Sequence, residues 1–422
     1  MAGIIIGASI FAQPSEITRL LPTSSAITLA WLAAGALTLC GALVCAELAS
    51  AFPTTGGVYV FLSRAFGPAA GFLWGWAMFW TMHSGILAAI SVIFARYLAL
   101  FVPLDDGAQR IAAAGIILVL SAVNYAGVRH GGLVQTALTA VKVLAIAALI
   151  GAGWWLAPAA AAAAPTTPDP VGAGAFVLAV GAGLFAFGGW HMVTYAAGEI
   201  VDPARTVPRA LILGTLIVTA CYAGLNAVYL RVLPLDAVRG SSRIAADLAQ
   251  AIAGPGAASA VAALVLISTM GALNGIVLAG PRVYYSMAND GLLFPAFARV
   301  HPTFRTPHVA IALQGVWAAA LALTNSYRAL FSRVVYTEWV FFGLMAVGLI
   351  LLRRRPHYQP AVRVPGYPLV PAAFALAAFL VVGIQIWSQP LDSLLGLGFV
   401  SLGLPVYLAW ARSRRAQGGT PS

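Results

Sequence analysis

Long apolar runs, separated by short polar segments, fill almost the whole of this chain. A helix needs about 20 apolar residues to cross a hydrocarbon layer ~30 Å thick, and runs of that length occur about twelve times. We therefore predict an all-α membrane protein with about twelve transmembrane helices. The expected ranges are 1–21, 26–50, 70–101, 110–127, 132–156, 172–199, 208–232, 255–288, 307–325, 332–352, 367–388 and 393–411.

Two of these runs contain a break in the helical pattern. Gly7-Ala8-Ser9 interrupts the first run, and Gly188-Gly189 interrupts the sixth. Glycine is also common where membrane helices pack closely, so close packing is the simpler interpretation of these glycines. An unpaired peptide group in hydrocarbon costs several kcal/mol, so a chain unwinds there only where it meets protein, water or a polar ligand. The paired breaks therefore predict a binding site at mid-membrane.

The spacing of the breaks also predicts how the chain is organised. They lie five spans apart, as the first helices of two inverted five-helix repeats would. We expect repeats over 1–156 and 172–352, within a core of 1–388 that includes the eleventh helix. Residues 389–422 would form the twelfth helix and a tail. No repeat of residue identity is visible.

Composition excludes a soluble globule. The chain is 61% hydrophobic and 8% charged, with a mean hydropathy of +0.91, whereas soluble domains carry roughly a quarter charged residues. Cys40, Cys45 and Cys221 all lie in apolar runs, so neither a disulfide framework nor a metal site is expected. We also expect no cofactor.

The positive charge indicates orientation rather than a nucleic-acid partner. The net charge is +11, but the arginines lie at the ends of apolar runs and form no single patch. If the N-terminus lies in the cytoplasm, thirteen loop arginines fall on the cytoplasmic side of the membrane and seven on the outer side. This distribution predicts a multi-pass protein of the cell membrane with both termini cytoplasmic.

Several segments together resemble the amino acid-polyamine-organocation superfamily. Gly3 to Phe11, followed by Pro14, is similar to that superfamily's G-S-G-I-F turn and proline. The branch that resembles this chain most is the L-type amino-acid transporters and their bacterial relatives. The other matching segments are Ala46-Glu47-Leu48, Pro53 to Tyr59, Phe66-Gly67-Pro68, Phe187 to Trp190, Glu199 to Pro203, Pro208-Arg209-Ala210, Asn289-Asp290-Gly291 and Arg305-Thr306-Pro307.

The resemblance implies that main-chain groups at the breaks bind a free amino acid. Such a zwitterion needs donors for its carboxylate and acceptors for its ammonium, and the ends of half-helices offer both. By resemblance, the amides of Ala8 and Ser9, after Gly7, would hold the carboxylate. Ala8 replaces the family's usual serine, and Ser9 its usual second glycine. The expected acceptors for the ammonium are the carbonyls of Ile5, Phe185, Ala186 and Gly188.

Three side chains are further candidates for the substrate site. Phe185 matches the aromatic residue that closes over the substrate in relatives, although it could simply pack against neighbouring helices. His191 stands where the L-type branch usually has asparagine, and could bind substrate, titrate, or satisfy only a local partner. Tyr229 is a candidate contact from the seventh span, or an interfacial tyrosine.

Lys142 is the one lysine of the chain, and it lies near the middle of the fifth predicted span. A charge there costs at least ~2.5 kcal/mol, so the side chain should face the bundle and have defined partners. By resemblance, its ammonium substitutes for sodium, and bridges first-span carbonyls to the hydroxyl of Ser268 or Thr269. Sodium-independent transport follows from this assignment.

The acidic residues at the ends of spans suggest gating contacts. Glu47 and Glu199 are expected to pair with arginines such as Arg64 or Arg209. Arg282 is expected to be an interfacial anchor. The role of Glu338 is open.

The resemblance favours a secondary transporter of neutral L-amino acids that works by alternating access, as an exchanger or a facilitator. The alternative is a proton-coupled carrier, or a carrier of cationic amino acids or polyamines. An acidic side chain beside the breaks would favour it, and none lies within seven residues of Gly7 or Gly188. A third alternative is an intramembrane enzyme or receptor, for which no catalytic motif is present.

The expected partners are a small amino acid and the lipid bilayer. Animal L-type relatives join a heavy chain through a cysteine between the third and fourth spans. The segment 102–107 holds no cysteine, so we expect no disulfide-linked heavy chain, and a monomer or homodimer.

Overall fold

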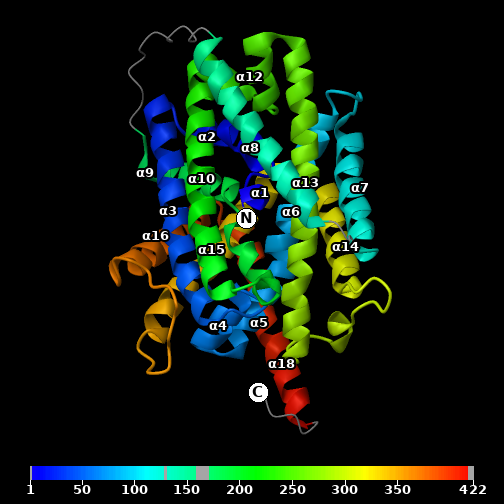
Figure 1. The fold of residues 1–422 in the computed structure, drawn as a ribbon, viewed down its shortest axis with the longest axis vertical. Helices are drawn as coiled ribbons and strands as arrows, with labels where there is room; N and C mark the ends of the chain where they lie inside the picture. Colours follow the sequence, from blue (N-terminus) through cyan, green and yellow to red (C-terminus); the bar gives the residue numbers. More distant parts are fainter. Residues whose placement is uncertain (1, 128–130, 158–170, 417–422) are drawn as a thin grey trace.

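The computed structural model describes residues 2–127, 131–157 and 171–416, which form helices and no strand within these ranges. The helices assemble into an elongated bundle, with most of the long ones running along its length (Figure 1). In the described part, nine helices are long and apolar enough to cross a membrane, and three shorter apolar helices accompany them. The all-α membrane fold is therefore confirmed.

Each predicted span has a helical counterpart. Polar caps begin three of the helices, because the side chains of Thr23, Asp105 and Ser326 accept hydrogen bonds from the first free amides. The spans outside the two breaks are α3 (Ser24–Ala51), α5 (Pro68–Ala77) with α6 (His83–Leu98), α7 (Asp106–Tyr125), α8 (Gly131–Trp155), α10 (Pro203–Val232), α13 (Pro255–Asn289), α14 (His308–Thr324), α15 (Tyr327–Leu352), α16 (Leu369–Ser388), and α17 (Pro390–Ser401) with α18 (Gly403–Ala416).

Both breaks are present. The first span consists of α1 (Ala2–Ile5), the short 3₁₀ helix η1 (Ser9–Phe11) and α2 (Gln13–Leu20). The sixth span is α9 (Ala173–Ala186) followed by the 3₁₀ helix η3 (Trp190–Glu199). Between them Gly189 adopts φ +89°, a left-handed conformation that glycine reaches without a steric penalty. The symmetry of the two repeats stays a prediction.

Some elements were not predicted. A π-helical turn, η2 (Met78–Met82), joins α5 to α6 within the third span. Short helices α4 (Val58–Phe66), α11 (Leu235–Gly240) and α12 (Ile244–Ala253), with the 3₁₀ turn η4 (Pro295–Ala298), lie between spans. In Figure 1, α12 lies at the upper end of the bundle, and α4 and α5 lie at the lower end.

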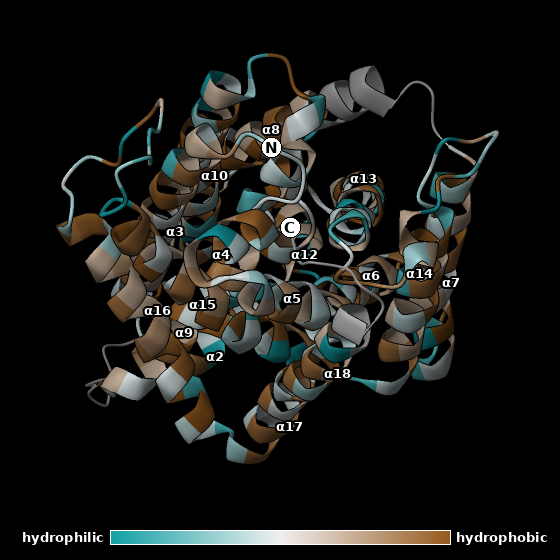
Figure 2. Ribbon diagram, turned by 90° about the horizontal axis from the view of Figure 1, so that it is seen from below, coloured by the Kyte–Doolittle hydropathy of each residue, from teal (hydrophilic) through white to brown (hydrophobic). Residues whose placement is uncertain are grey.

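The outer surface of the bundle suits a lipid environment. Figure 2, seen from below, shows hydrophobic residues on the peripheral helices. Leu29 on α3, Val119 on α7, Leu376 on α16 and Trp387 at the end of α16 are all exposed. Large side chains such as Trp74 are instead fully buried. Exposed apolar residues on so many spans would be costly in water, so the protein is a multi-pass membrane protein.

Candidate functional site

The two breaks meet at one small cavity inside the bundle, called here the central cavity. Its volume is about 10 Å³, which is room for roughly one water molecule. Five of the predicted site residues line it: Ile5, Gly7, Ser9, Phe185 and Gly188. The remaining lining residues are Ile86, Ile90, Gly189, Met192, Ile276, Val334 and Glu338.

The first break offers hydrogen-bond donors. Both Ala8 and Ser9 are buried, and neither of their amides has a hydrogen-bond acceptor among the described residues. Buried N–H groups are almost always paired in proteins. These amides at the start of η1 are therefore suited to an anionic group, as the sequence predicts.

Tyr222 of α10 joins the two breaks, and the sequence did not single it out. Its hydroxyl lies 2.8 Å from the carbonyl oxygen of Ile5 and 3.1 Å from that of Ala186, and donates to them. Both carbonyls were predicted to accept the substrate's ammonium. The single hydroxyl proton of Tyr222 is shared between these two acceptors, and the amide of Gly188 donates to the carbonyl of Phe185 at 2.9 Å.

Tyr229, the predicted contact from the same helix, lies elsewhere. It is fully buried and is not among the residues that line the central cavity. Tyr222 and Tyr229 lie seven residues apart, so they share one helix face at depths about two turns apart. On this helix the tyrosine level with the breaks is therefore Tyr222, and a substrate contact of Tyr229 stays a prediction.

His191 lies behind the wall of the central cavity rather than in it. Its Nε2 atom lies 2.8 Å from the hydroxyl of Tyr195 and 3.5 Å from the carboxylate of Glu338. The ring is buried, and the edges of Trp74, Trp190 and Phe342 surround it. Any influence of His191 on a bound substrate therefore passes through its neighbours.

Glu338 overturns the premise that the breaks have no acidic neighbour. This residue of α15 is buried and lines the central cavity. It is far from both breaks in sequence, and it reaches them only because α15 packs against α9 and α6. The search over seven residues on either side of each break could not find it.

Lys142 connects the first span to the eighth. Its Nζ atom lies 2.9 Å from the carbonyl oxygen of Ser268 and 3.5 Å from that of Gly3. The Ser268 hydroxyl donates to the carbonyl of Gly7 at 2.9 Å. The predicted bridge therefore exists, but Lys142 bonds the main chain of Ser268. Thr269 donates instead to Leu266 of its own helix.

Charged contacts close the lower end of the bundle, with partners other than those predicted. Glu47 pairs with Arg353 rather than Arg64, and Glu199 pairs with Arg282 rather than Arg209. Arg282 is thus a partner in an ion pair. The partners are separated by 306 residues in one case and 83 in the other, which local motifs cannot reveal.

A further contact at the lower end links α4 to the end of α13. The Tyr59 hydroxyl donates to Asp290 at 2.5 Å. Burial, together with this hydrogen bond, raises the pKa of the Tyr59 hydroxyl, so it keeps its proton and remains a donor. Together with the ion pairs, this contact holds the lower end closed.

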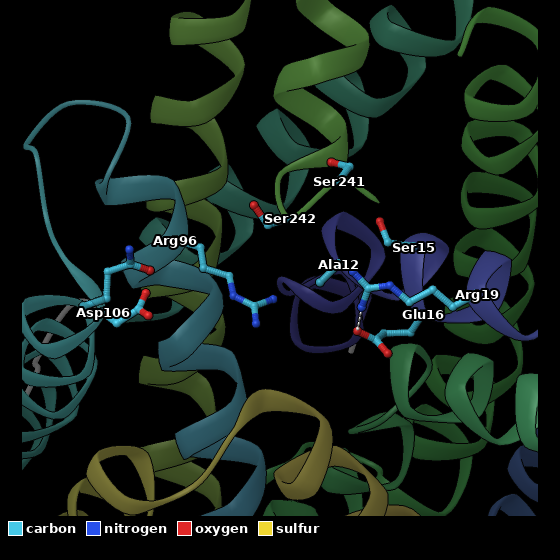
Figure 3. A pocket seen from close by; sticks show the side chains of 9 residues that line it. Ala12, Ser15, Glu16, Arg19, Arg96, Asp106, Ser241 and Ser242 are labelled. Carbon is cyan, nitrogen blue, oxygen red and sulfur yellow. Dashed lines mark hydrogen bonds and ion pairs between the residues drawn. The ribbon is translucent and has the colours of Figure 1, made fainter. Parts of the chain in front are cut away.

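The upper side holds a larger, charged pocket of about 270 Å³. Figure 3 shows the Arg96 side chain of α6 reaching toward α2, where Arg19 and Glu16 form an ion pair at 2.7 Å. Among the described residues Arg96 forms no ion pair. The full lining is Ala12, Ser15, Glu16, Arg19, Arg96, Asp106, Gln109, Ser241 and Ser242.

Aromatic rings separate this charged pocket from the central cavity. The Arg96 guanidinium lies 5.1 Å from the ring centre of Tyr327. That ring in turn packs edge-on against Phe185 at 6.3 Å, and Phe331 packs against both. Because Phe185 lines the central cavity, its ring lies between the cavity and this aromatic cluster.

Helices broken at mid-membrane around an enclosed cavity, with contacts that close each end, define a membrane transporter rather than an enzyme. The family model for amino acid permeases matches residues 1–397, and the chain belongs to this family. Its membership in the amino acid-polyamine-organocation superfamily is thereby confirmed.

Curated relatives cover nearly all of the chain. It is 31% identical to the serine/threonine exchanger SteT of Bacillus subtilis, over 96% of this chain and 93% of that protein. It is 30% identical to the human large neutral amino acids transporter small subunit 2, over 96% and 78% respectively. It is 29% identical to the human b(0,+)-type amino acid transporter 1, over 98% and 87%. The protein is thus an amino-acid transporter similar to the L-type branch.

Proposed function

We propose that this protein is a sodium-independent carrier of neutral L-amino acids, acting as an exchanger or a facilitator. The observation that carries the proposal is the meeting of the two breaks at one cavity. Unpaired amides of Ala8 and Ser9 are available on one break. Tyr222 holds the carbonyls of Ile5 and Ala186, one from each break. Donors and acceptors in this arrangement match the two charges of a zwitterion.

The neutral character of the substrate is supported by the apolar part of the central cavity. Ile86, Ile90, Ile276 and Val334 provide an apolar wall, which suits an uncharged side chain. Two relatives are named for serine and threonine and for large neutral amino acids. The central cavity must expand to admit any amino acid.

The unequal closures support alternating access. The lower end is held by ion pairs such as Glu47 with Arg353, whereas aromatic rings separate the cavity from the charged pocket above. Rocking of the broken spans against the remaining helices would open one closure at a time. In our proposal the repeats 1–156 and 172–352 are the units related by inversion, and the lower end faces the cytoplasm.

Lys142 supports independence from sodium. Its ammonium bonds the carbonyls of Gly3 in α1 and Ser268 in α13, the position at which the family resemblance has a lysine substitute for sodium. A second cation beside it would meet strong repulsion in a medium of low dielectric constant. In this proposal the positive charge between the two helices is therefore supplied by the protein itself.

We expect counterflow of labelled L-serine or L-leucine into proteoliposomes at equal rates in sodium and in choline buffer. Liposomes loaded with unlabelled amino acid and diluted into each buffer provide the measurement, with protein-free liposomes as the control. A several-fold requirement for sodium would refute the role of Lys142. Absence of counterflow for every amino acid would refute the proposed function itself.

A further inference from the structure

Glu338 has no role in the transport scheme given so far, although it lies at the centre of the molecule. In the described part of the chain it is the one residue with an ionisable side chain that lines the central cavity. Its side chain is 7% exposed. An ionisable group at this depth is costly, and such groups in transporters generally bind ions or substrates.

The surroundings of Glu338 leave its negative charge without a fixed counter-ion. Within the described ranges no arginine or lysine lies within ion-pair distance of the Glu338 carboxylate. The one basic side chain at that distance, among the described residues, is His191 at 3.5 Å. Tyr195, which faces Glu338, uses its hydroxyl in the bond to His191. The titratable groups next around this cluster are His83, Tyr284 and Cys45.

The charge of the site can be counted from these contacts. A zwitterion has no net charge, and the dipoles of the two breaks match its two ends. An ionised Glu338 beside a neutral His191 then adds one uncompensated negative charge. Burying such a charge costs several kcal/mol. The closed, occupied site is therefore stable when one further positive charge is present.

We propose that the occupied site takes up one positive charge in addition to the zwitterion, and that Glu338 with His191 holds it. For a neutral amino acid the charge is a proton, shared between the carboxylate and the imidazole. For a cationic amino acid it is the substrate's own side-chain ammonium or guanidinium. This inference rests on the proposed function, and it names the charge that accompanies the substrate.

The proton step is balanced. When the cavity opens to one side, the Glu338–His191 pair takes a proton from water on that side. The proton stays on the pair while the substrate is enclosed, and it returns to water when the cavity opens to the other side. A cationic substrate requires the pair to be free of this proton.

The two sources of charge predict opposite responses to pH. A neutral amino acid binds the protonated pair, so its affinity falls as the pH rises, by up to ~tenfold per pH unit. A cationic amino acid binds the deprotonated pair, so its affinity falls as the pH is lowered, with the same limiting slope. Binding equilibria report this linkage whether the protein exchanges or facilitates.

The experiment is calorimetric binding of L-serine and of L-lysine to the purified full chain, between about pH 5 and 9. Tighter binding of L-serine at low pH identifies the proton as the charge. Tighter binding of L-lysine at high pH identifies the substrate side chain. Binding that does not change with pH for either ligand overturns the inference. If L-serine, L-lysine and the other amino acids all fail to bind at every pH, the proposed function fails as well.

Variants assign the charge to Glu338. Glu338→Gln should bind L-serine with a flat pH profile and should lose L-lysine binding. Glu338→Leu, of similar volume, serves if the glutamine variant does not fold, and its L-serine profile should also be flat. Glu338→Asp retains the carboxylate and should retain the slope. A wild-type slope in the glutamine or leucine variant overturns the assignment.

Discussion

The Lys142→Ala variant is expected to lose nearly all transport while it still folds. Its ammonium holds the carbonyls of Gly3 and Ser268 together, and thereby joins the broken first span to α13. Loss of one charge-assisted hydrogen bond costs about 1.5–3 kcal/mol, which corresponds to a roughly 10- to 150-fold effect. Initial uptake of labelled L-serine into proteoliposomes, normalised to reconstituted protein, measures the loss.

Two further variants serve as comparisons for Lys142→Ala. Val141→Ala changes the neighbouring side chain, which is 52% exposed on the outer surface of α8, and should transport at nearly the wild-type rate. Ser268→Ala keeps the carbonyl that Lys142 uses but removes the hydroxyl bound to Gly7, so an intermediate loss is expected. If the Lys142→Ala protein retained more than half of the wild-type uptake, the bridge would have no role in transport.

The second large effect is expected at the lower end. Arg353→Ala should destabilise the protein by about 3–5 kcal/mol, because it leaves the fully buried carboxylate of Glu47 without its cation. Glu47 also accepts the amide of Val364 at 2.7 Å, and its hydrogen bonds to Arg353 raise the pKa of that guanidinium. Thermal unfolding of the purified variant in detergent measures the loss.

A double-mutant cycle separates this ion pair from general damage. Adding Glu47→Gln to Arg353→Ala removes the unpaired charge, so it should restore part of the lost stability. Arg354→Ala, at the exposed neighbouring arginine, should leave the unfolding temperature unchanged. Equal stability of Arg353→Ala and Arg354→Ala would contradict the role assigned to the pair.

The sequence predicts those features whose physical cause is local. A glycine break in an apolar run leaves main-chain N–H and C=O groups unpaired, and this energetic cost arises at the break itself. Gly7 and Gly188 could therefore be recognised without any tertiary information. Lys142 could be recognised because a single charge in the middle of an apolar run needs partners. The choice of Ser268 or Thr269 as its partner came from the family resemblance. The twelve expected helices follow from the length of the apolar runs.

Features that depend on packing between spans could not be predicted. Tyr222 bonds Ile5 across 217 residues, and nothing in the sequence indicates which turn of α10 lies level with the breaks. Glu338 contacts the central cavity because α15 packs beside the sixth span. The arginine partners of Glu47 and Glu199 were wrong for the same reason. Charge complementarity limits the possible pairs, but only the fold selects among them.

The account depends on main-chain groups of two broken helices binding both charges of a zwitterion. Competition against labelled L-leucine counterflow tests this directly, with unlabelled L-leucine, its methyl ester and 4-methylpentanoic acid as competitors. The ester lacks the carboxylate, and the acid lacks the ammonium. We predict that each analogue competes at least on the order of 100-fold more weakly than L-leucine. Competition by either analogue as strong as that of L-leucine would contradict the account.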